Sequence, residues 1–303
     1  MSTVSIERLR KVYGPFVAVD DLTLTIPSGT VFGLIGPNGA GKTTTFKCML
    51  DLARPTAGTV RYDGVPLQPQ AFETIAYVPE RSVLYDWMTV AEHIEMQRRT
   101  YKAFSPARAL ELLEEFQIDP KKRARSLSKG MRTATMVALA FAREASLLIL
   151  DEPTSGLDPI NQRSVLNLMI NEAARGTTIV FSSHQIGQVE RAAERIAIID
   201  RGRIVLEGEV DDLKAGRKII EGIFPDESWS LDGLDSDRRV ARIDRNGRIV
   251  RLLSTDAAGD LAARMESLGA VAVRIVDLNL EDIFLYAVSP ANETAVVVEE
   301  TRS

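Results

Sequence analysis

Two adjacent carboxylates, Asp151 and Glu152, follow the apolar run Leu147–Leu150, which is typical of a buried strand. A carboxylate that loses its water is costly unless a proton, a metal ion or a cation accompanies it. One interpretation is a metal ion held at the end of the strand, with the second acid doing chemistry beside it. The other is a strand that surfaces at an Asp-Glu turn. The run alone does not distinguish the two.

The segment Gly36–Thr43 decides between them, because it matches the pattern G-x-x-x-x-G-K-[ST] in every fixed position. Thr30–Ile35 before it indicates a buried strand, and Thr43–Leu52 after it indicates a helix. Glycines let successive backbone N–H groups surround phosphate oxygens, and a helix N-terminus favours the same anion. This context favours a nucleotide-phosphate loop over a structural glycine-rich turn. The expected nucleotide contacts in it are Gly36, Pro37, Asn38, Gly39, Ala40, Gly41, Lys42, Thr43 and Thr44.

The loop gives both acids a role. Lys42 is expected to reach the β- and γ-phosphates of the nucleotide, and the Thr43 hydroxyl to ligate Mg²⁺. Asp151 then becomes the acid that holds Mg²⁺, and Glu152 becomes the group that orients or deprotonates the attacking water. The sequence therefore predicts hydrolysis of a nucleoside triphosphate, with Lys42 and Glu152 as catalytic residues.

Composition limits the other possibilities. A chain of 303 residues can hold a main domain and a smaller one, and its net charge of −5 argues against nucleic acid as a partner. The basic cluster Lys121–Arg125 is short enough for a solvated face or a protein contact. The single cysteine, Cys48, excludes an internal disulfide framework and is expected to be a small buried hydrophobe. No apolar run approaches the roughly 18 residues of a membrane span, so a span would have to come from another chain.

Three further segments complete a pattern. Leu127–Met131 precedes an apolar helix pattern, Pro153–Asp158 follows the two acids, and Ile179–His184 is typical of a strand that ends in a histidine. With the phosphate loop, this order resembles the nucleotide-binding subunit of an ABC transporter over about residues 4–210. The Leu-Ser-Lys-Gly-Met form is similar to the branch that contains drug, antibiotic and sodium exporters with separate membrane subunits.

The resemblance implies the fold class. An α/β fold is expected, with a RecA-like P-loop NTPase core, an antiparallel β subdomain and a helical subdomain at about residues 81–145. The ABC-type nucleotide-binding domain would occupy residues 1–212, and a small C-terminal α+β domain residues 213–303, with a loosely ordered tail from Ser289. The role of that second domain stays open between regulation, dimer support and contact with the membrane subunit.

The C-terminal residues themselves carry local signals. Asn246-Gly247 between two β-like runs predicts a hairpin over Val240–Leu253. Ala257–Leu268 and Leu280–Val288 indicate helices, and Val271–Val276 indicates a strand. No catalytic constellation occurs among them, so the expected chemistry lies in the first domain.

The resemblance also implies roles for residues outside the phosphate loop. Tyr13 resembles the aromatic residue that stacks on adenine, although a core tyrosine fits its surroundings too. Ser128 and the Gly130 backbone resemble the parts of the signature motif that touch the γ-phosphate from the opposite subunit. Asp158 lies in a segment similar to the D-loop, which links the two active sites, and it is also a suitable helix N-cap. His184 resembles the switch histidine that contacts the γ-phosphate.

Two positions, Glu80 and Lys129, differ from the residues that are usual in the family motifs, and two other features lie outside these motifs. Glu80 stands where the Q-loop glutamine is usual, and we expect it to ligate Mg²⁺ and take part in catalysis, since a carboxylate is a hard oxygen donor. Lys129 replaces a signature glycine and either adds positive charge toward the nucleotide or faces outward. The segment Trp87–Ile94 suits a groove that receives a helix of the membrane subunit, or plain core packing. His93 is expected on the surface of a helix.

These observations predict an ATP-hydrolysing subunit that pairs head-to-tail with a second nucleotide-binding subunit, expected to be its own copy, around two ATP molecules. It would drive export through a separate transmembrane permease, at the cytoplasmic face of the membrane, with ATP and Mg²⁺ as cofactors. A soluble ATPase acting on DNA or ribosomes is the first alternative. The 109 positions between Lys42 and Asp151 disfavour a DNA-acting member, because they leave no room for the long coiled coil of that class. Ribosome-acting members usually carry two cassettes in one chain, whereas one is recognised here. A hydrolysis-impaired module with a competent partner is disfavoured by the presence of Glu152 and His184. The transported substrate is not encoded here.

Overall fold

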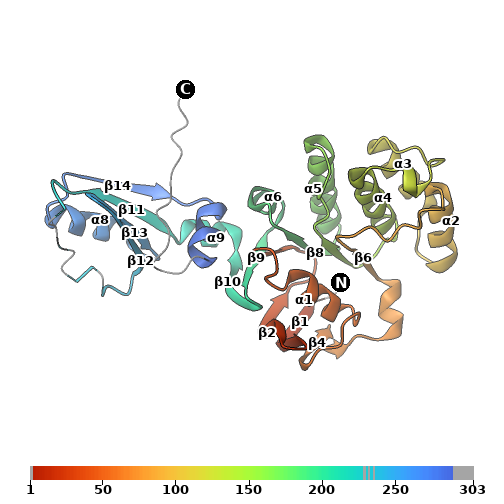
Figure 1. Ribbon diagram of the computed structural model, residues 1–303, viewed down its shortest axis with the longest axis horizontal. Coiled ribbons are helices and arrows are strands. Elements are labelled where there is room, and N and C mark those ends of the chain that lie inside the picture. The colour runs from red at the N-terminus through yellow and green to blue at the C-terminus, as the bar shows by residue number, and fades with distance from the viewer. Residues whose placement is uncertain (1–2, 228–229, 231–232, 235, 289–303) are drawn as a thin grey trace. The chain divides into compact units, whose positions relative to one another are not determined.

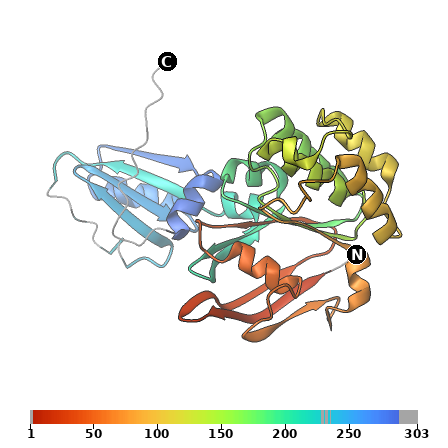
Figure 2. The ribbon, with the colours of Figure 1, turned by 45° about the vertical axis from the view of Figure 1, so that its right-hand side comes forward.

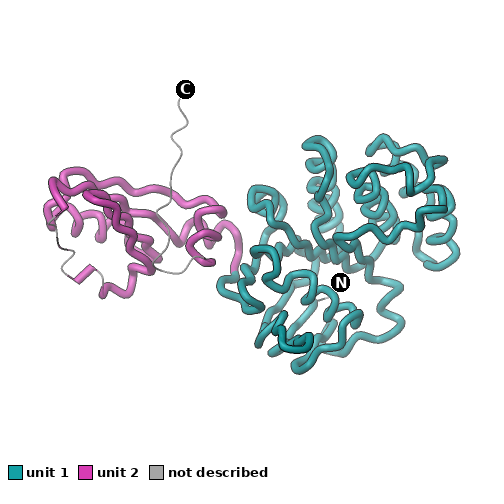
Figure 3. The backbone as a smooth tube through the Cα atoms, in the orientation of Figure 1, with its two compact units in different colours: residues 1–207 teal, residues 208–303 magenta. Residues whose placement is uncertain are grey.

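The computed structural model describes residues 3–227, 230, 233–234 and 236–288, and the chain divides into two compact units (Figure 3). Unit 1 comprises residues 1–207 and unit 2 residues 208–303. Each unit has a hydrophobic core of its own. The predicted loosely ordered tail from Ser289 lies outside the described residues.

A six-stranded sheet in the order β10-β9-β3-β8-β7-β6 forms the centre of unit 1. Its strands are β3 (Val31–Ile35), β6 (Ile75–Val78), β7 (Leu147–Asp151), β8 (Thr178–Ser183), β9 (Arg195–Asp200) and β10 (Arg203–Glu209). Five neighbouring strands pair in parallel, in the order β9-β3-β8-β7-β6. Every residue of β3, β7 and β8 is buried, as expected for parallel strands that are covered on both faces. Because parallel strands end at one edge of a sheet, the segments after β3, β7 and β8 come together there.

Helices cover both faces of this sheet (Figures 1 and 2). The helix that follows the phosphate loop, α1, lies on one face, whereas α5 and α6 pack against β3 and β8 on the other. The bounds of these helices are α1 (Lys42–Met49), α5 (Pro159–Ala174) and α6 (Ile186–Ala192). The arrangement confirms the predicted RecA-like α/β core.

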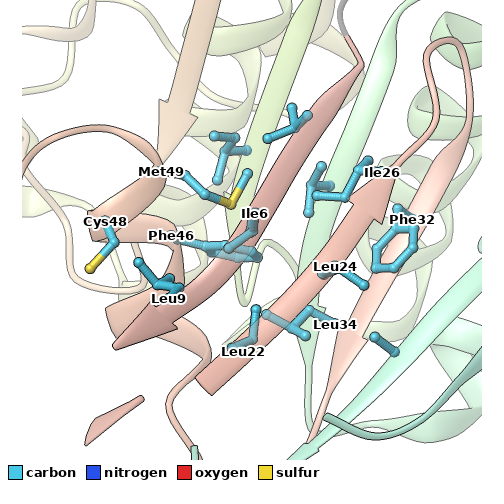
Figure 4. Packing of buried hydrophobic residues seen from close by; sticks show 14 of the residues in the cluster. Ile6, Leu9, Leu22, Leu24, Ile26, Phe32, Leu34, Phe46, Cys48 and Met49 are labelled. Atoms are coloured by element: carbon cyan, nitrogen blue, oxygen red, sulfur yellow. The ribbon is translucent and has the colours of Figure 1, made fainter. Parts of the chain in front are cut away.

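A four-stranded antiparallel sheet, in the order β2-β1-β4-β5, lies on the far side of α1. Its strands are β1 (Val4–Tyr13), β2 (Phe16–Ile26), β4 (Ala57–Tyr62) and β5 (Val65–Pro66). Apolar side chains of β1 and β2 share one core with Phe46 and Met49 of α1 and with Phe32 of β3 (Figure 4). This core fixes the start of α1, and therefore the phosphate loop, between the two sheets. Cys48 is buried beside it, as predicted, and burial raises the pKa of its thiol to about 11.

The segment between β6 and β7 is helical. It holds α2 (Val90–Thr100), α3 (Pro106–Glu115), η2 (Ala124–Ser126) and α4 (Lys129–Phe141), and a 3₁₀ turn, η1 (Pro69–Glu73), precedes β6. Thr89 and Glu92 form a capping box at α2, which stabilises that helix start. Val90 and Ile94 are buried, which confirms core packing for these two residues, whereas Trp87 is 67% exposed. A groove for a helix of the membrane subunit stays a prediction.

His93 is not on the surface, and that prediction is wrong. Its ring is only 1% exposed, because the loop after β6 folds back over α2. The Tyr85 backbone N–H donates to His93 Nε2 at 2.9 Å, and His93 Nδ1 lies 2.8 Å from the Thr89 carbonyl oxygen. A neutral ring protonated at Nδ1 satisfies both partners. His93 therefore ties this loop to the helix.

Unit 2 is a small α+β unit around a four-stranded antiparallel sheet in the order β12-β13-β11-β14. Its elements are α7 (Val210–Ala215), β11 (Lys218–Ile223), β12 (Val240–Asn246), β13 (Ile249–Ser254), α8 (Ala258–Ser267), β14 (Ala272–Asp277) and α9 (Leu280–Val288). The predicted hairpin is confirmed, with Asn246 opposite Ile249 and Gly247 at φ +56°. Glu221, the buried acid of this sheet, is paired with Arg251 and Arg274 from neighbouring strands. Among the helices of the described segments, none is both long and apolar enough to cross a membrane.

Candidate active site

A cleft of about 600 Å³ lies in unit 1 beside the ends of β3, β7 and β8. It gathers predicted residues from the phosphate loop, the segment after β6, and the ends of β7 and β8. The lining residues are Phe16, Ala18, Asn38, Gly39, Ala40, Gly41, Lys42, Thr43, Thr44, Glu80, Lys129, Asp151, Glu152, Ser155 and His184. Six predicted nucleotide contacts do not line it: Tyr13, Gly36, Pro37, Ser128, Gly130 and Asp158.

The phosphate loop has no room for a side chain at Gly36 or Gly41. A Cβ at Gly36 would lie 2.2 Å from the Ile199 carbonyl oxygen, and Gly41 has φ +114°, a conformation that favours glycine. Lys42 Nζ donates to the Gly36 carbonyl at 2.7 Å and to the Pro37 carbonyl at 3.2 Å. The lysine side chain therefore bonds back to the loop that precedes it. Gly36 and Pro37 do not line the cleft, but their carbonyl groups hold the Lys42 ammonium.

Burial lowers the pKa of Lys42, and the nearby carboxylates of Glu152, Asp151 and Glu80 oppose this shift. The ammonium group faces three acids in one cleft, so it is held close to the place where a triphosphate would add negative charge. A cation that has already lost most of its water is well prepared to bind phosphate oxygens.

Asp151 is 1% exposed and accepts two hydrogen bonds. Thr43 Oγ1 donates to its Oδ2 at 2.7 Å, and Ser182 Oγ donates to its Oδ1 at 2.6 Å. Thr43, Asp151 and Glu80 give the cleft a set of hard oxygen donors suited to Mg²⁺. Within the described segments, no three acidic, histidine or cysteine side chains are grouped closely enough to hold a metal ion by themselves.

Glu152 is oriented by its neighbours. Its Oε2 lies 2.8 Å from His184 Nδ1, and its backbone N–H donates to Ser182 Oγ at 3.0 Å. Glu152 has φ +52°, a left-handed conformation that a non-glycine residue keeps only when the surrounding structure holds it. A carboxylate fixed by a histidine at a cleft wall can position a water molecule and accept its proton.

Sequence reasoning missed Ser182, which contacts both acids. The contact follows from the pairing of the strands, because Ser182 on β8 is the lateral partner of Asp151 on β7. A small hydroxyl residue beside an acid at the end of a parallel strand satisfies the buried carboxylate without adding charge. Ser182 therefore orients both acids.

Three predicted contacts lie on helix starts outside the cleft. Ser128 Oγ accepts from the Met131 N–H at 3.2 Å, which caps α4. Gly130 is pressed against the next loop, where a Cβ would lie 2.2 Å from the Gly156 carbonyl oxygen. Asp158 caps α5 by accepting from the Ile160 and Asn161 N–H groups, as the sequence indicated.

Tyr13 and Phe16 face each other at the end of the β1–β2 hairpin, and only Phe16 lines the cleft. The Lys11 ammonium lies 4.7 Å from the centre of the Tyr13 ring, which gives that ring a separate partner. Because Phe16 is 58% exposed and borders the phosphate loop, we expect it to contribute to adenine stacking.

We predict that Phe16→Ala weakens ATP binding by about 5- to 30-fold, as expected for the loss of about 1–2 kcal/mol of ring stacking. Tyr13→Ala is the matched variant at the facing position of the hairpin. Titration of each variant with a fluorescent ATP analogue gives the affinities. Wild-type affinity in Phe16→Ala together with a loss in Tyr13→Ala would return the stacking role to Tyr13 alone.

The fold and the cleft define a P-loop nucleoside triphosphatase of the α/β class. Residues 19–155 match the family model described as "ABC transporter". A Nod factor export ATP-binding protein I of Cupriavidus metallidurans is 35% identical, with 93% of this chain and 96% of that protein aligned. The bacitracin transport ATP-binding protein BcrA of Enterococcus faecalis is 32% identical, with 93% and 94% covered.

Solved structures agree with these sequence relatives. The structure of an ATP-binding subunit of an ABC transporter has a TM-score of 0.64 at 32% identity, and the match covers 70% of this chain and 92% of that one. A dimeric ATP-binding cassette in a post-hydrolysis state, bound to ADP and Pi, has a TM-score of 0.62 at 25% identity, with 68% and 98% covered. The chain belongs to the family of ABC transporter ATP-binding proteins. It is accordingly an ATPase.

Proposed function

We propose that two copies of this chain close head-to-tail around two ATP molecules and thereby drive export through a separate transmembrane permease. The observation that carries this proposal is the division of the nucleotide contacts within one chain. The phosphate loop and the acids line one cleft, whereas Ser128 and Gly130 do not line it. Lys129, which lies between them, does line the cleft. Because the resemblance assigns Ser128 and Gly130 to the γ-phosphate of an opposite subunit, head-to-tail pairing would supply these two contacts to both sites.

Within each site the side chains divide the work. Lys42 binds the terminal phosphates, and the Thr43 hydroxyl, Asp151 and Glu80 hold Mg²⁺, which neutralises phosphate charge when it is bound. Glu152 orients the attacking water and accepts its proton, with its carboxylate fixed by His184 at 2.8 Å. His184 is 52% exposed at the cleft wall and can also contact the γ-phosphate.

The signature and D-loop residues act across the dimer. Ser128 caps α4, and its hydroxyl together with the N-terminal backbone of that helix provides hydrogen-bond donors for the γ-phosphate bound by the partner. Asp158 fixes the start of α5 directly after the loop that would meet the second subunit. The solved cassette bound to ADP and Pi is described as dimeric, which supports pairing in this family.

A second cavity, of about 400 Å³, supports contact with a permease. It lies between the loop after β6 and helices α2 and α4, and Val83, Tyr85 and Phe72 line it with apolar surface. Val83 is 66% exposed, and Tyr85 51%. An apolar groove of this kind suits a short amphipathic helix. Because the loop that forms it begins at Glu80, the groove and the nucleotide cleft share one segment of chain. The named relatives in export and in bacitracin transport support the same interpretation.

The test is partner-stimulated ATPase activity. The protein is purified with the membrane protein encoded beside it and reconstituted into vesicles, and ATP turnover is compared with that of the subunit alone. We expect stimulation by the permease. Its absence at saturating permease would refute the transport role while leaving the ATPase assignment intact.

Glu80→Gln is the sharpest variant for this assay. Glutamine removes one negative charge from the cleft but keeps an oxygen ligand, so ATP binding should stay within about threefold of wild type. The stimulation by the permease is expected to change by about threefold or more, because Glu80 begins the loop that lines the groove. Unaltered stimulation in Glu80→Gln would show that Glu80 does not link the two sites.

A further inference from the structure

Lys129 is the first residue of α4, and its side chain reaches the loop that follows Glu152 in the same chain. Lys129 Nζ donates a hydrogen bond to Ser155 Oγ at 3.0 Å. Its methylene groups cross Gly156, where a built Cβ would lie 3.3 Å from Lys129 Cγ and Cδ. The lysine therefore has a partner within its own subunit, and neither sequence interpretation of it anticipated this one.

Two further contacts join α4 to this loop. Gly130 packs so closely that a Cβ there would lie 2.2 Å from the Gly156 carbonyl oxygen. Thr133 Oγ1, one turn along the helix, donates to the Ser155 carbonyl oxygen at 3.1 Å. Contacts from Lys129, Gly130 and Thr133 therefore hold this loop against the N-terminal part of α4.

Ser155 is in turn hydrogen-bonded to the backbone of Glu152, the proposed general base. Its backbone N–H donates to the Glu152 carbonyl at 3.0 Å and closes a turn over residues 152–155. Glu152 begins this turn in a left-handed conformation, at φ +52°. Such a conformation persists only where the surrounding structure holds it. Ser182 and His184 hold the Glu152 end, whereas Lys129 holds the Ser155 end.

We propose that Lys129 is a positioning residue that fixes Ser155, and through it the Glu152 turn, within one subunit. The inference rests on the proposed role of Glu152 in hydrolysis. The inferred role of Lys129 within its own subunit differs from that of Ser128 and Gly130, which are proposed to contact the nucleotide bound by the other subunit. A positive charge that acted across the dimer would have no effect on an isolated, nucleotide-free chain, and this difference provides the test.

The first measurement is hydrogen exchange of the full-length, nucleotide-free protein at a concentration where it is monomeric. Lys129→Ala is expected to speed amide exchange in residues 153–157 about threefold or more, whereas Lys129→Arg, which keeps a donor within reach of Ser155, stays near wild type. Lys121→Ala removes an exposed lysine elsewhere in the helical region and serves as the control. Equal exchange in Lys129→Ala and Lys121→Ala would overturn the proposal.

The second measurement is steady-state ATP hydrolysis. Lys129→Ala is expected to lower kcat about fivefold, the effect of one typical hydrogen bond, with the KM for ATP within twofold and with recovery in Lys129→Arg. Ser155→Ala should give a similar loss, and the double variant should lose no more than Ser155→Ala alone. A main effect on KM, no recovery in Lys129→Arg, or a full further loss in the double variant would contradict positioning through Ser155.

The two measurements keep the proposals separate. A wild-type protein that hydrolyses no ATP would refute the role of Glu152 in the proposed function. The exchange experiment contains no ATP and still decides whether Lys129 holds the loop. Faster exchange without any loss of kcat in an active enzyme would refute the positioning role alone.

Discussion

Glu152→Gln is expected to lower the kcat for ATP by about 10²- to 10⁴-fold, the usual contribution of a general base, and to leave ATP affinity within about threefold. Glutamine has nearly the shape of glutamate, and its amide oxygen can still accept from His184, which lies 2.8 Å from the carboxylate. What it loses is the ability to take a proton from water. Coupled-enzyme kinetics gives kcat, and equilibrium titration with ATP gives the affinity.

The same substitution tests the dimer. If ATP binding closes two subunits and hydrolysis reopens them, Glu152→Gln should accumulate an ATP-dependent dimer that light scattering detects at about twice the monomer mass. Ser182→Ala offers a graded comparison, because it removes the hydroxyl that orients Glu152 but keeps the acid itself. Turnover in Glu152→Gln within tenfold of wild type would assign the base to another group.

Much of the site was predictable because its signals are local. The phosphate loop is one continuous segment, and the apolar runs before Gly36 and Asp151 indicated the two strands that carry it and the acids. The Asn246-Gly247 hairpin was equally local, since two residues set the turn and therefore the pairing of β12 with β13.

What escaped prediction depends on contacts between distant segments. Ser182 meets Asp151 only because β7 and β8 pair in one particular register. Lys129 meets Ser155 across 26 positions, and no feature of Leu127–Met131 indicates that contact. His93 looked like a surface residue because a helix pattern does not show which loop will fold over it. Motif spacing indicates the groups that we propose to react, whereas the contacts that hold these groups in place follow from the packed fold.

Asp151→Asn is expected to lower ATP turnover by at least about 10²-fold and to abolish the gain in ATP affinity that Mg²⁺ provides. Asp151 is buried, and its carboxylate accepts from the Thr43 and Ser182 hydroxyls. Asparagine keeps the shape but has no negative charge, and its amide group must donate to one of these hydroxyls. Titration with ATP in Mg²⁺ and in EDTA gives two affinities, and their ratio should approach one.

Asp200→Asn is the matched control for this experiment. Asp200 also ends a parallel strand of the central sheet, but it lies outside the cleft and its carboxylate faces Arg201 at 3.8 Å. We expect wild-type dependence on Mg²⁺ and a kcat within about twofold, because Asp200 does not line the cleft in which Mg²⁺ and phosphate are proposed to bind. The thermal midpoint of nucleotide-free Asp151→Asn should not fall, since the substitution removes a buried charge from a cleft that also contains Glu80 and Glu152. If Asp151→Asn keeps the wild-type thermal midpoint and its ATP affinity still rises with Mg²⁺ as in wild type, the metal would be assigned to Glu80 instead.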